Sequence, residues 1–198
     1  MDANRIPTIE EIDQLAELVR HAMDDVPRVW RIASRGQSRV AYAAQVAWFH
    51  ETLNALYRPF WIAYQSLRRG DRSVIEPLVR FLEADPFCFR SGYLKERFID
   101  AITQIDLGHE QRARLTTALL DVLDKPARRE FRHYVRLARY LDSPELRETL
   151  EGVQAAGGSG SRHARWILEG MAEGRGHPRF MGQGRRTGRQ GPVVGRGL

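Results

Sequence analysis

The chain has one cysteine and no long uninterrupted apolar run, and each scarcity excludes a class of protein. Cys88 is the single cysteine among 198 residues, so an internal disulfide is impossible and a reducing compartment is favoured. The most apolar segment, residues 40–67, is broken by His50, Glu51 and Arg58, and it falls short of the roughly 18 apolar residues of a membrane span. The acidic N-terminus does not resemble a signal peptide. We therefore expect a cytoplasmic protein without membrane association.

Lysine is also scarce, because Lys95 and Lys125 are the only two among 31 basic residues and the other 29 are arginine. A GC-rich genome produces the same skew, so clustered arginines count for less here than in an average chain. The charge is unevenly placed. Residues 157–198 hold eight arginines and two glutamates, which accounts for the whole formal net charge of +6. Residues 1–156 are neutral, so the basic character belongs to the C-terminal segment.

The alternating pattern of a half-buried strand does not occur over any useful length, whereas apolar residues recur every three or four positions. The sequence therefore predicts an all-α fold of antiparallel helix pairs joined by short turns. We expect helices at 8–26, 38–57, 59–69, 73–84, 93–105, 110–123, 127–141 and 144–152.

Capping residues and prolines set several of these limits. Thr8 with Glu11, and Ser73 with Glu76, have the spacing of a capping box, in which each side chain accepts from a free backbone N–H. Proline lacks an N–H and disrupts a helix interior. We therefore expect the first helix to end before Pro27 and the second apolar segment to divide at Pro59.

The pair 73–105 aligns with the pair 110–141 at a displacement of 37 residues. The matched positions are Leu78 with Leu115, Leu82 with Leu119, Leu94 with Phe131, Phe98 with Val135 and Ala101 with Ala138. In period and in paired helices this segment resembles a HEAT- or armadillo-type repeat. The resemblance implies a short solenoid of stacked pairs, and a compact helical bundle is the alternative.

The composition changes at Gly157, where Gly-Gly-Ser-Gly-Ser has the character of a flexible linker. We expect an all-helical domain at 1–156 and a disordered Gly/Arg-rich tail at 157–198, with one short helix at 162–172 that docks back on the domain. Beyond Gly174 there is too little apolar surface to offset the entropy of ordering the chain.

The motifs of catalysis and metal binding are incomplete. The dipeptides His50-Glu51 and His109-Glu110 are not followed by a second histidine four residues on, as a zinc protease requires. Cys88 lies between Phe87 and Phe89, an apolar setting that raises the pKa of a thiol. We expect no catalytic residue, cofactor or metal site, and we keep an enzyme whose site forms only in three dimensions as a third alternative.

One pattern has chemical meaning, a stripe of arginines on the predicted helix 127–141. At 100° per residue its members fall within about 80° of arc, apart from the apolar face. Such a stripe costs stability through like-charge repulsion unless it faces an anion. That anion is either a phosphate backbone or carboxylates of a neighbouring helix such as Glu110, Asp121 or Glu145. The members of the stripe are Arg128, Arg132, Arg136 and Arg139.

These features favour a non-enzymatic helical scaffold that binds nucleic acid, RNA more than DNA, through the stripe and the basic tail. Arg185, Arg186 and Arg189 stand in a glycine-rich context that resembles RNA-binding arginine-glycine segments, although a tail that only adds solubility is an equal alternative. The second hypothesis is a protein–protein adaptor that uses its helical face near Trp48 and Trp61, with an acidic protein as partner. The oligomeric state does not follow from the sequence.

Overall fold

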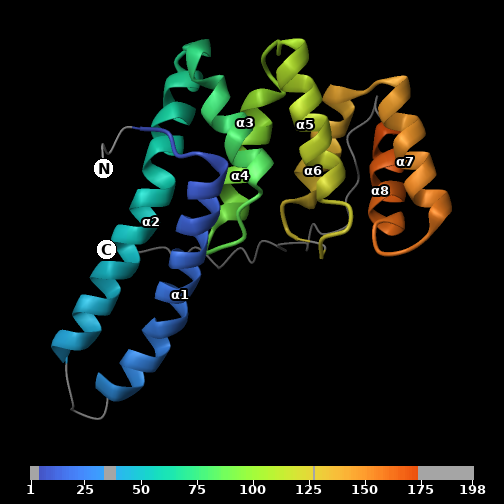
Figure 1. Ribbon diagram of the computed structural model, residues 1–198. Coiled ribbons are helices and arrows are strands. Elements are labelled where there is room, and N and C mark those ends of the chain that lie inside the picture. The colour runs from blue at the N-terminus through green and yellow to red at the C-terminus, as the bar shows by residue number, and fades with distance from the viewer. Residues whose placement is uncertain (1–4, 34–38, 127, 174–198) are drawn as a thin grey trace, which may run out of the picture.

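The computed structural model describes residues 5–33, 39–126 and 128–173, and within these ranges the chain is all-helical (Figure 1). Eight α-helices and one short 3-10 helix make up the described part, which contains no strand. The all-α prediction is therefore confirmed. None of the helices described is long and apolar enough to cross a membrane.

Helix α1, Ile9–Ala33, begins at the predicted capping box. The backbone N–H of Thr8 donates to Glu11 Oε2 at 2.8 Å, and that of Glu11 donates to Thr8 Oγ1 at 3.2 Å. The predicted end at Pro27 is wrong, because the helix continues through it. A proline costs a helix interior about 3 kcal/mol. The part of the helix beyond Pro27 still packs on the next helix, where the Trp30 ring contacts the Tyr42 ring edge-on at 5.1 Å.

Helix α2, Arg39–Arg68, is also continuous, so the predicted division at Pro59 is wrong. Pro59 and Phe60 are both buried, and the Phe60 ring lies 4.8 Å from the ring of Phe81 on a neighbouring helix. Tertiary packing of an apolar face contributes more to helix stability than local propensity does, which explains why the helix persists through a proline.

Asp71 caps the next segment in place of the predicted Ser73. Its Oδ1 accepts from the Ser73 backbone N–H at 3.0 Å and opens the 3-10 helix η1, Arg72–Val74. Helix α3, Ile75–Ala84, follows directly. The Ser73–Glu76 capping box is therefore wrong, because an aspartate two residues earlier takes the N-cap position first.

Helices α4, Ser91–Ile102, and α5, His109–Asp121, continue the chain. The internal repeat has a structural counterpart, because α3 packs on α5 and α4 packs on the helix that follows α5. Leu78 and its equivalent Leu115 are both fully buried, as are Leu82 and Leu119. Repeated positions thus face one core, while the likeness to HEAT and armadillo proteins stays a prediction.

Helix α6, Phe131–Leu141, begins four residues later than predicted, so Arg128 and Arg129 lie outside it. Helix α7, Pro144–Ala156, has the expected start, with Ser143 Oγ accepting from the Leu146 N–H at 3.2 Å. The predicted stop at Gly152 is wrong, because that glycine lies inside α7 and the helix ends four residues later.

Helix α8, Ser161–Ala172, occupies the segment where a docked helix was expected, and it packs on α6 and α7. Ile167 is fully buried and Met171 nearly so. The folded body therefore extends beyond residue 156, where the sequence placed its boundary. The remainder of the predicted disordered tail, residues 174–198, lies outside the described residues.

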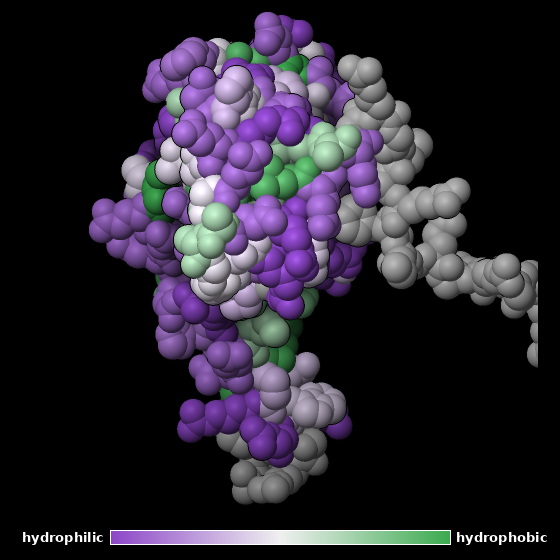
Figure 2. Space-filling view, turned by 90° about the vertical axis from the view of Figure 1, so that its right-hand side faces the viewer, coloured by the Kyte–Doolittle hydropathy of each residue, from purple (hydrophilic) through white to green (hydrophobic). Residues whose placement is uncertain are grey.

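The helices form a stack with an arm at one end. Helices α4, α6 and α8 pack one on the next, α3 packs on α5, and the α1–α2 hairpin closes the stack against α3 and α4. One apolar core runs from Ile12 in α1 to Met171 in α8. Figure 1 shows the far half of the hairpin projecting away from the other helices. Polar side chains cover most of the opposite end, at α7 and α8 (Figure 2).

Candidate functional site

The predicted arginine stripe does not stand free in water. Arg128 precedes α6, and its Nη1 lies 3.1 Å from Asp85 Oδ2. Its guanidinium also stacks over the Phe87 ring, 4.3 Å from the centroid. Only a fifth of the Arg128 side chain is exposed, so it ties the α5–α6 connection to the end of α3.

Arg139, at the other end of the stripe, is equally occupied. Its Nε donates to the backbone carbonyl of Gly170 at 2.6 Å and so joins α6 to α8. Its Nη2 is buried and has no hydrogen-bond partner in the described part of the chain. Arg139 is thus a structural residue, which leaves two members of the stripe near solvent.

Arg132 and Arg136 each meet one carboxylate of α4. Arg136 Nη1 lies 2.8 Å from Asp100 Oδ1, and Arg132 Nη2 lies 3.7 Å from Glu96 Oε1. About half of each arginine side chain remains exposed, 45% for Arg136 and 56% for Arg132. Exposed pairs of this kind are worth little, so both guanidinium groups can still contact an added anion.

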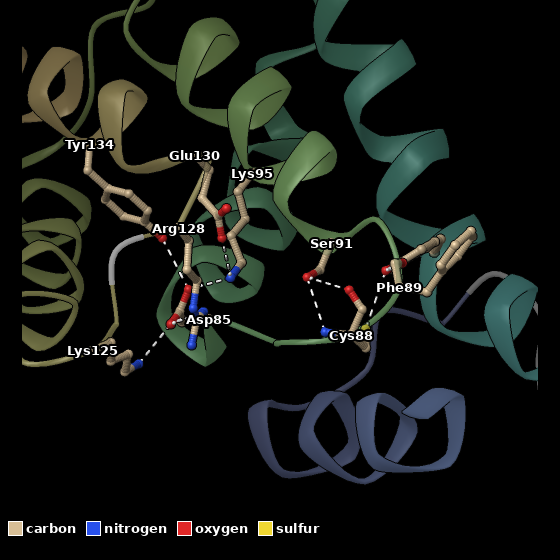
Figure 3. Close-up of polar contacts among 10 residues, drawn as sticks. Asp85, Cys88, Phe89, Ser91, Lys95, Lys125, Arg128, Glu130 and Tyr134 are labelled. Carbon is tan, nitrogen blue, oxygen red and sulfur yellow. Dashed lines mark hydrogen bonds and ion pairs between the residues drawn. The ribbon is translucent and has the colours of Figure 1, made fainter. Parts of the chain in front are cut away.

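A buried ionic cluster lies behind Arg128 (Figure 3). Lys95 of α4 is fully buried, and its Nζ contacts Asp85 Oδ1 and lies 3.5 Å from Glu130 Oε1. Lys125 Nζ reaches Asp85 Oδ2 at 2.8 Å. The hydroxyl of Tyr134, on α6, donates to Asp85 Oδ1 at 3.3 Å. A single aspartate therefore joins α3, α4, the α5–α6 connection and α6.

The backbone at both ends of the α3–α4 connection is left-handed without glycine. Asp85 has φ 43° and Arg90 has φ 62°. Residues other than glycine seldom adopt this region, and aspartate is among the better tolerated. At Asp85 this conformation ends α3, and the carboxylate meets Lys95, Lys125 and Arg128.

The cluster shifts the protonation equilibria of its members. Burial alone would raise the pKa of Asp85, but the charge of Lys95 and the hydrogen bonds from Lys125 and Lys95 outweigh it, and the pKa lies below its ordinary value. Burial lowers the pKa of Lys95 even though Asp85 and Glu130 oppose that shift. Burial also raises the pKa of Tyr134 well above its usual range.

Perturbed groups of this kind occur in active sites, but this cluster has no room for a substrate. The cavity beside Asp85, Arg128 and Tyr134 measures about 10 Å³, the space of one water molecule. We interpret the cluster as a structural joint. Structural ion-pair networks perturb pKa values as active sites do.

Cys88 lies in the α3–α4 connection, as Figure 3 shows. Its sulfur is 3.3 Å from the Tyr57 hydroxyl, and burial raises the pKa of the thiol. The predicted direction of the thiol pKa is therefore confirmed. In the ranges that the structure describes, no group of three or more histidine, cysteine, aspartate or glutamate side chains is placed to hold a metal ion.

The structure reveals a groove that the sequence did not indicate. It has a volume of about 570 Å³ and lies between α2, α4 and α6. Arg68, Arg97 and Arg136 converge on it from these three helices. Among the described residues, neither Arg68 nor Arg97 pairs with a carboxylate, and Asp100 is the one acid that lines the groove.

Two exposed aromatic rings border the same face, and each carries a stacked guanidinium. Arg97 lies over the Trp61 ring at 5.3 Å, and Arg129 lies over the Tyr93 ring at 4.0 Å. Trp61 is 37% exposed and Tyr93 is 47% exposed. Stacked arginine and aromatic planes at a surface are suited to cation–π contacts and to stacking of further planar groups.

The face formed by α2, α4 and α6 therefore has a surplus of positive charge. Its five arginines face two carboxylates, a balance of 5 − 2 = +3. We call this set the basic face. The arginines are Arg68, Arg97, Arg129, Arg132 and Arg136, and the carboxylates are Glu96 and Asp100.

No local pattern could have found Arg68 and Arg97. They lie on different helices and are brought together only because α2 packs beside α4. The tail arginines Arg185, Arg186 and Arg189 lie outside the described residues.

Comparison with protein-family models, with curated proteins and with solved structures found no match for this chain.

Proposed function

We propose that this protein is a non-enzymatic helical scaffold that binds single-stranded nucleic acid, RNA in preference to DNA, across the basic face. The observation that carries the proposal is the convergence of Arg68, Arg97 and Arg136 on one groove of about 570 Å³. The site differs from the stripe predicted from the sequence, because Arg128 and Arg139 are committed to internal contacts.

The positive charge of the basic face favours an extended anionic ligand. The basic face has a surplus of three positive charges, although residues 1–156 as a whole are neutral. Guanidinium groups pair with phosphate through two parallel hydrogen bonds, which suits a ligand with repeated phosphates. The basic tail, with six arginines and no acidic residue after position 173, adds sequence-independent attraction.

The aromatic residues favour unpaired bases over a duplex. Trp61 and Tyr93 flank the arginines and are partly exposed. Single-stranded nucleic acid binds through backbone attraction combined with base stacking, whereas bases inside a duplex present no free face.

Fluorescence anisotropy with a labelled single-stranded RNA of mixed sequence tests the proposal on the full chain. Four phosphate contacts, from Arg68, Arg97, Arg132 and Arg136, predict a slope of log K against log salt of about −3, and the tail adds to it. Replacing Arg68 and Arg97 together by glutamine is expected to weaken binding at low salt and to reduce the slope by roughly 1.4, or 0.7 for each contact.

A matched control removes the same charge elsewhere. Arg28→Gln with Arg165→Gln alters two exposed arginines of α1 and α8, outside the groove, and should leave the affinity within about twofold of wild type, apart from long-range electrostatics. Absence of binding at low salt, or equal losses in the two double variants, would rule out the basic face as the site.

A protein–protein adaptor with an acidic partner is the second candidate. Trp48 and Trp61 are each 37% exposed, and Trp30 at the end of the arm is 55% exposed. Partly exposed tryptophans at a surface are typical of binding hot spots. A purified acidic protein partner that competes with RNA for the basic face would favour this alternative.

A further inference from the structure

The outer face of α2 carries a regular pattern that neither the basic face nor the core uses. Exposed residues recur at intervals of four, three, four, three and four positions along this helix, which is the spacing of a coiled-coil seam. We call this set the α2 seam. Its members are Ala44, Trp48, Glu51, Ala55, Arg58 and Ile62.

The α2 seam has no partner within the described part of the chain. All six residues are exposed, and Trp48 and Ile62 are 37% and 44% accessible. Neither Glu51 nor Arg58 makes an ion pair among the described residues, so both charges are available to a partner. Exposed apolar side chains at helical spacing, as Trp48 and Ile62 are, form a surface suited to another helix.

A groove runs beside the α2 seam. It has a volume of about 530 Å³ and is lined by Glu51, Ala55 and Arg58 of α2, together with Leu15 and Leu18 of α1. Figures 1 and 2 both show the far part of the arm standing clear of the other helices. A helix laid along the α2 seam would meet apolar side chains of both α1 and α2.

The α2 seam is complementary to itself. Ala55 is its centre, and Trp48 and Ile62 lie seven residues before and after it. Glu51 lies four residues before the centre and Arg58 three residues after. When a second α2 runs antiparallel across Ala55, each Trp48 meets the other copy's Ile62 and each Glu51 meets the other copy's Arg58. The small side chain at the centre allows the two helices to approach closely.

We propose that the protein forms a two-fold symmetric dimer through the α2 seam, in which α1 and α2 of both copies build an antiparallel four-helix bundle. A contact about a two-fold axis must use the same patch on both chains, so opposite charges have to be arranged symmetrically about its centre. Glu51 and Arg58 are arranged in this way. A uniformly basic partner would attract Glu51 and repel Arg58, and a uniformly acidic partner would do the reverse. The proposal goes beyond the RNA-binding function and does not rest on it.

The oligomeric state of the full chain tests the proposal directly. Sedimentation equilibrium and light scattering should give twice the chain mass of 22.8 kDa. Glu51→Arg and Arg58→Glu, made singly, each place like charges opposite one another at two symmetric positions. Each is expected to raise the dimer dissociation constant more than about tenfold. The double variant Glu51→Arg with Arg58→Glu restores both pairs and should restore the dimer.

The control is Glu148→Arg, the same reversal at an exposed position of α7, which should leave the dimer intact. Circular dichroism of each variant confirms that helix content is retained. A wild-type chain that stays monomeric, as it would if a different protein or another segment of this chain covers the α2 seam, overturns the proposal. A dimer that survives both single reversals overturns it as well.

Cross-linking provides a readout that does not depend on charge. Ala55→Cys, in a chain that also carries Cys88→Ser, places one thiol of each copy at the two-fold axis. Air oxidation should produce a disulfide-linked dimer, because helices that cross at an alanine approach closely enough for a disulfide. Glu148→Cys in the same background should cross-link far more slowly, and equal rates would contradict the two-fold geometry.

Discussion

Asp85 carries more interactions than any other carboxylate in the described part of the chain, and it does so in a left-handed backbone conformation. Its partners come from α4, from the α5–α6 connection and from α6. Lys95 is fully buried, so its charge depends on this carboxylate and on the more distant Glu130. Removal of one partner of a buried ion pair leaves an uncompensated charge, which costs more than the pair itself contributes.

We expect Asp85→Asn to lower the free energy of unfolding by about 3–5 kcal/mol at pH 7. Asparagine tolerates the left-handed conformation, so the substitution removes the charge without backbone strain. Chemical denaturation measures the effect. Glu145→Gln, an exposed carboxylate on α7, is the control and should change stability far less. A loss below about 1 kcal/mol would show that Lys95 finds compensation elsewhere.

The pKa of Asp85 predicts how this difference depends on pH. Because the folded-state pKa lies below the ordinary value of 3.8, the unfolded chain takes up a proton first as the pH falls. The contribution of Asp85 is complete above that value and is lost as the pH falls through the lower folded-state pKa. The difference in unfolding free energy between wild type and Asp85→Asn should therefore be constant near neutrality and shrink below pH 3.8. A difference that grows on acidification would contradict the assignment.

At the scale of elements, α6 and α8 pack closely at Gly170. A Cβ atom added to Gly170 would lie 2.2 Å from Val135 Cγ1, so glycine is required for the two helices to approach. The same approach allows Arg139 Nε to donate to the Gly170 carbonyl at 2.6 Å. The packing of α8 on α6 therefore depends on the lack of a side chain at Gly170. Because α6 carries part of the basic face, its position depends on the same contact.

Gly170→Ala is expected to destabilise the protein by about 1–3 kcal/mol, because the added methyl group forces α8 away from α6. Gly152→Ala is the matched control. It lies inside α7 with nothing within 4 Å of the added Cβ, so it should stabilise the fold by about 0.5–1 kcal/mol. Thermal and urea unfolding measure both. Val135→Ala should offset part of the Gly170→Ala loss, and strict additivity of the two substitutions would argue against direct contact.

At the scale of the whole molecule, the proposed function assigns separate roles to the folded body and to the basic segment. Helix α8 belongs to the core, so a truncation that respects the fold ends after residue 173. A chain ending there should keep the wild-type unfolding temperature, lose RNA affinity and show a shallower salt dependence, since six arginines are removed. A chain ending at residue 156 should be far less stable, because it uncovers the core beneath α8. Equal stability of the two truncations would contradict the packing.

Much of the fold was predictable from local pattern. The Thr8–Glu11 capping box, the start of α7 at Ser143 and the buried positions of the internal repeat all follow from interactions between residues a few positions apart. The failures share a cause. Pro27, Pro59 and Gly152 are helix-ending residues by local rules, yet each lies inside a helix. The remainder of each helix contributes more to stability than the single unfavourable residue costs.

The sequence by itself determined the all-α class, because the 3.6-residue periodicity of apolar side chains is a local property of the chain. It also determined the charge of the C-terminal segment. Only the tertiary structure decided which arginines meet solvent, because the carboxylates that pair with Arg128, Arg132 and Arg136 stand 36 to 43 residues away along the chain. Electrostatic pairing acts through space at a few ångströms, so the basic face came into being only when α2, α4 and α6 were brought side by side.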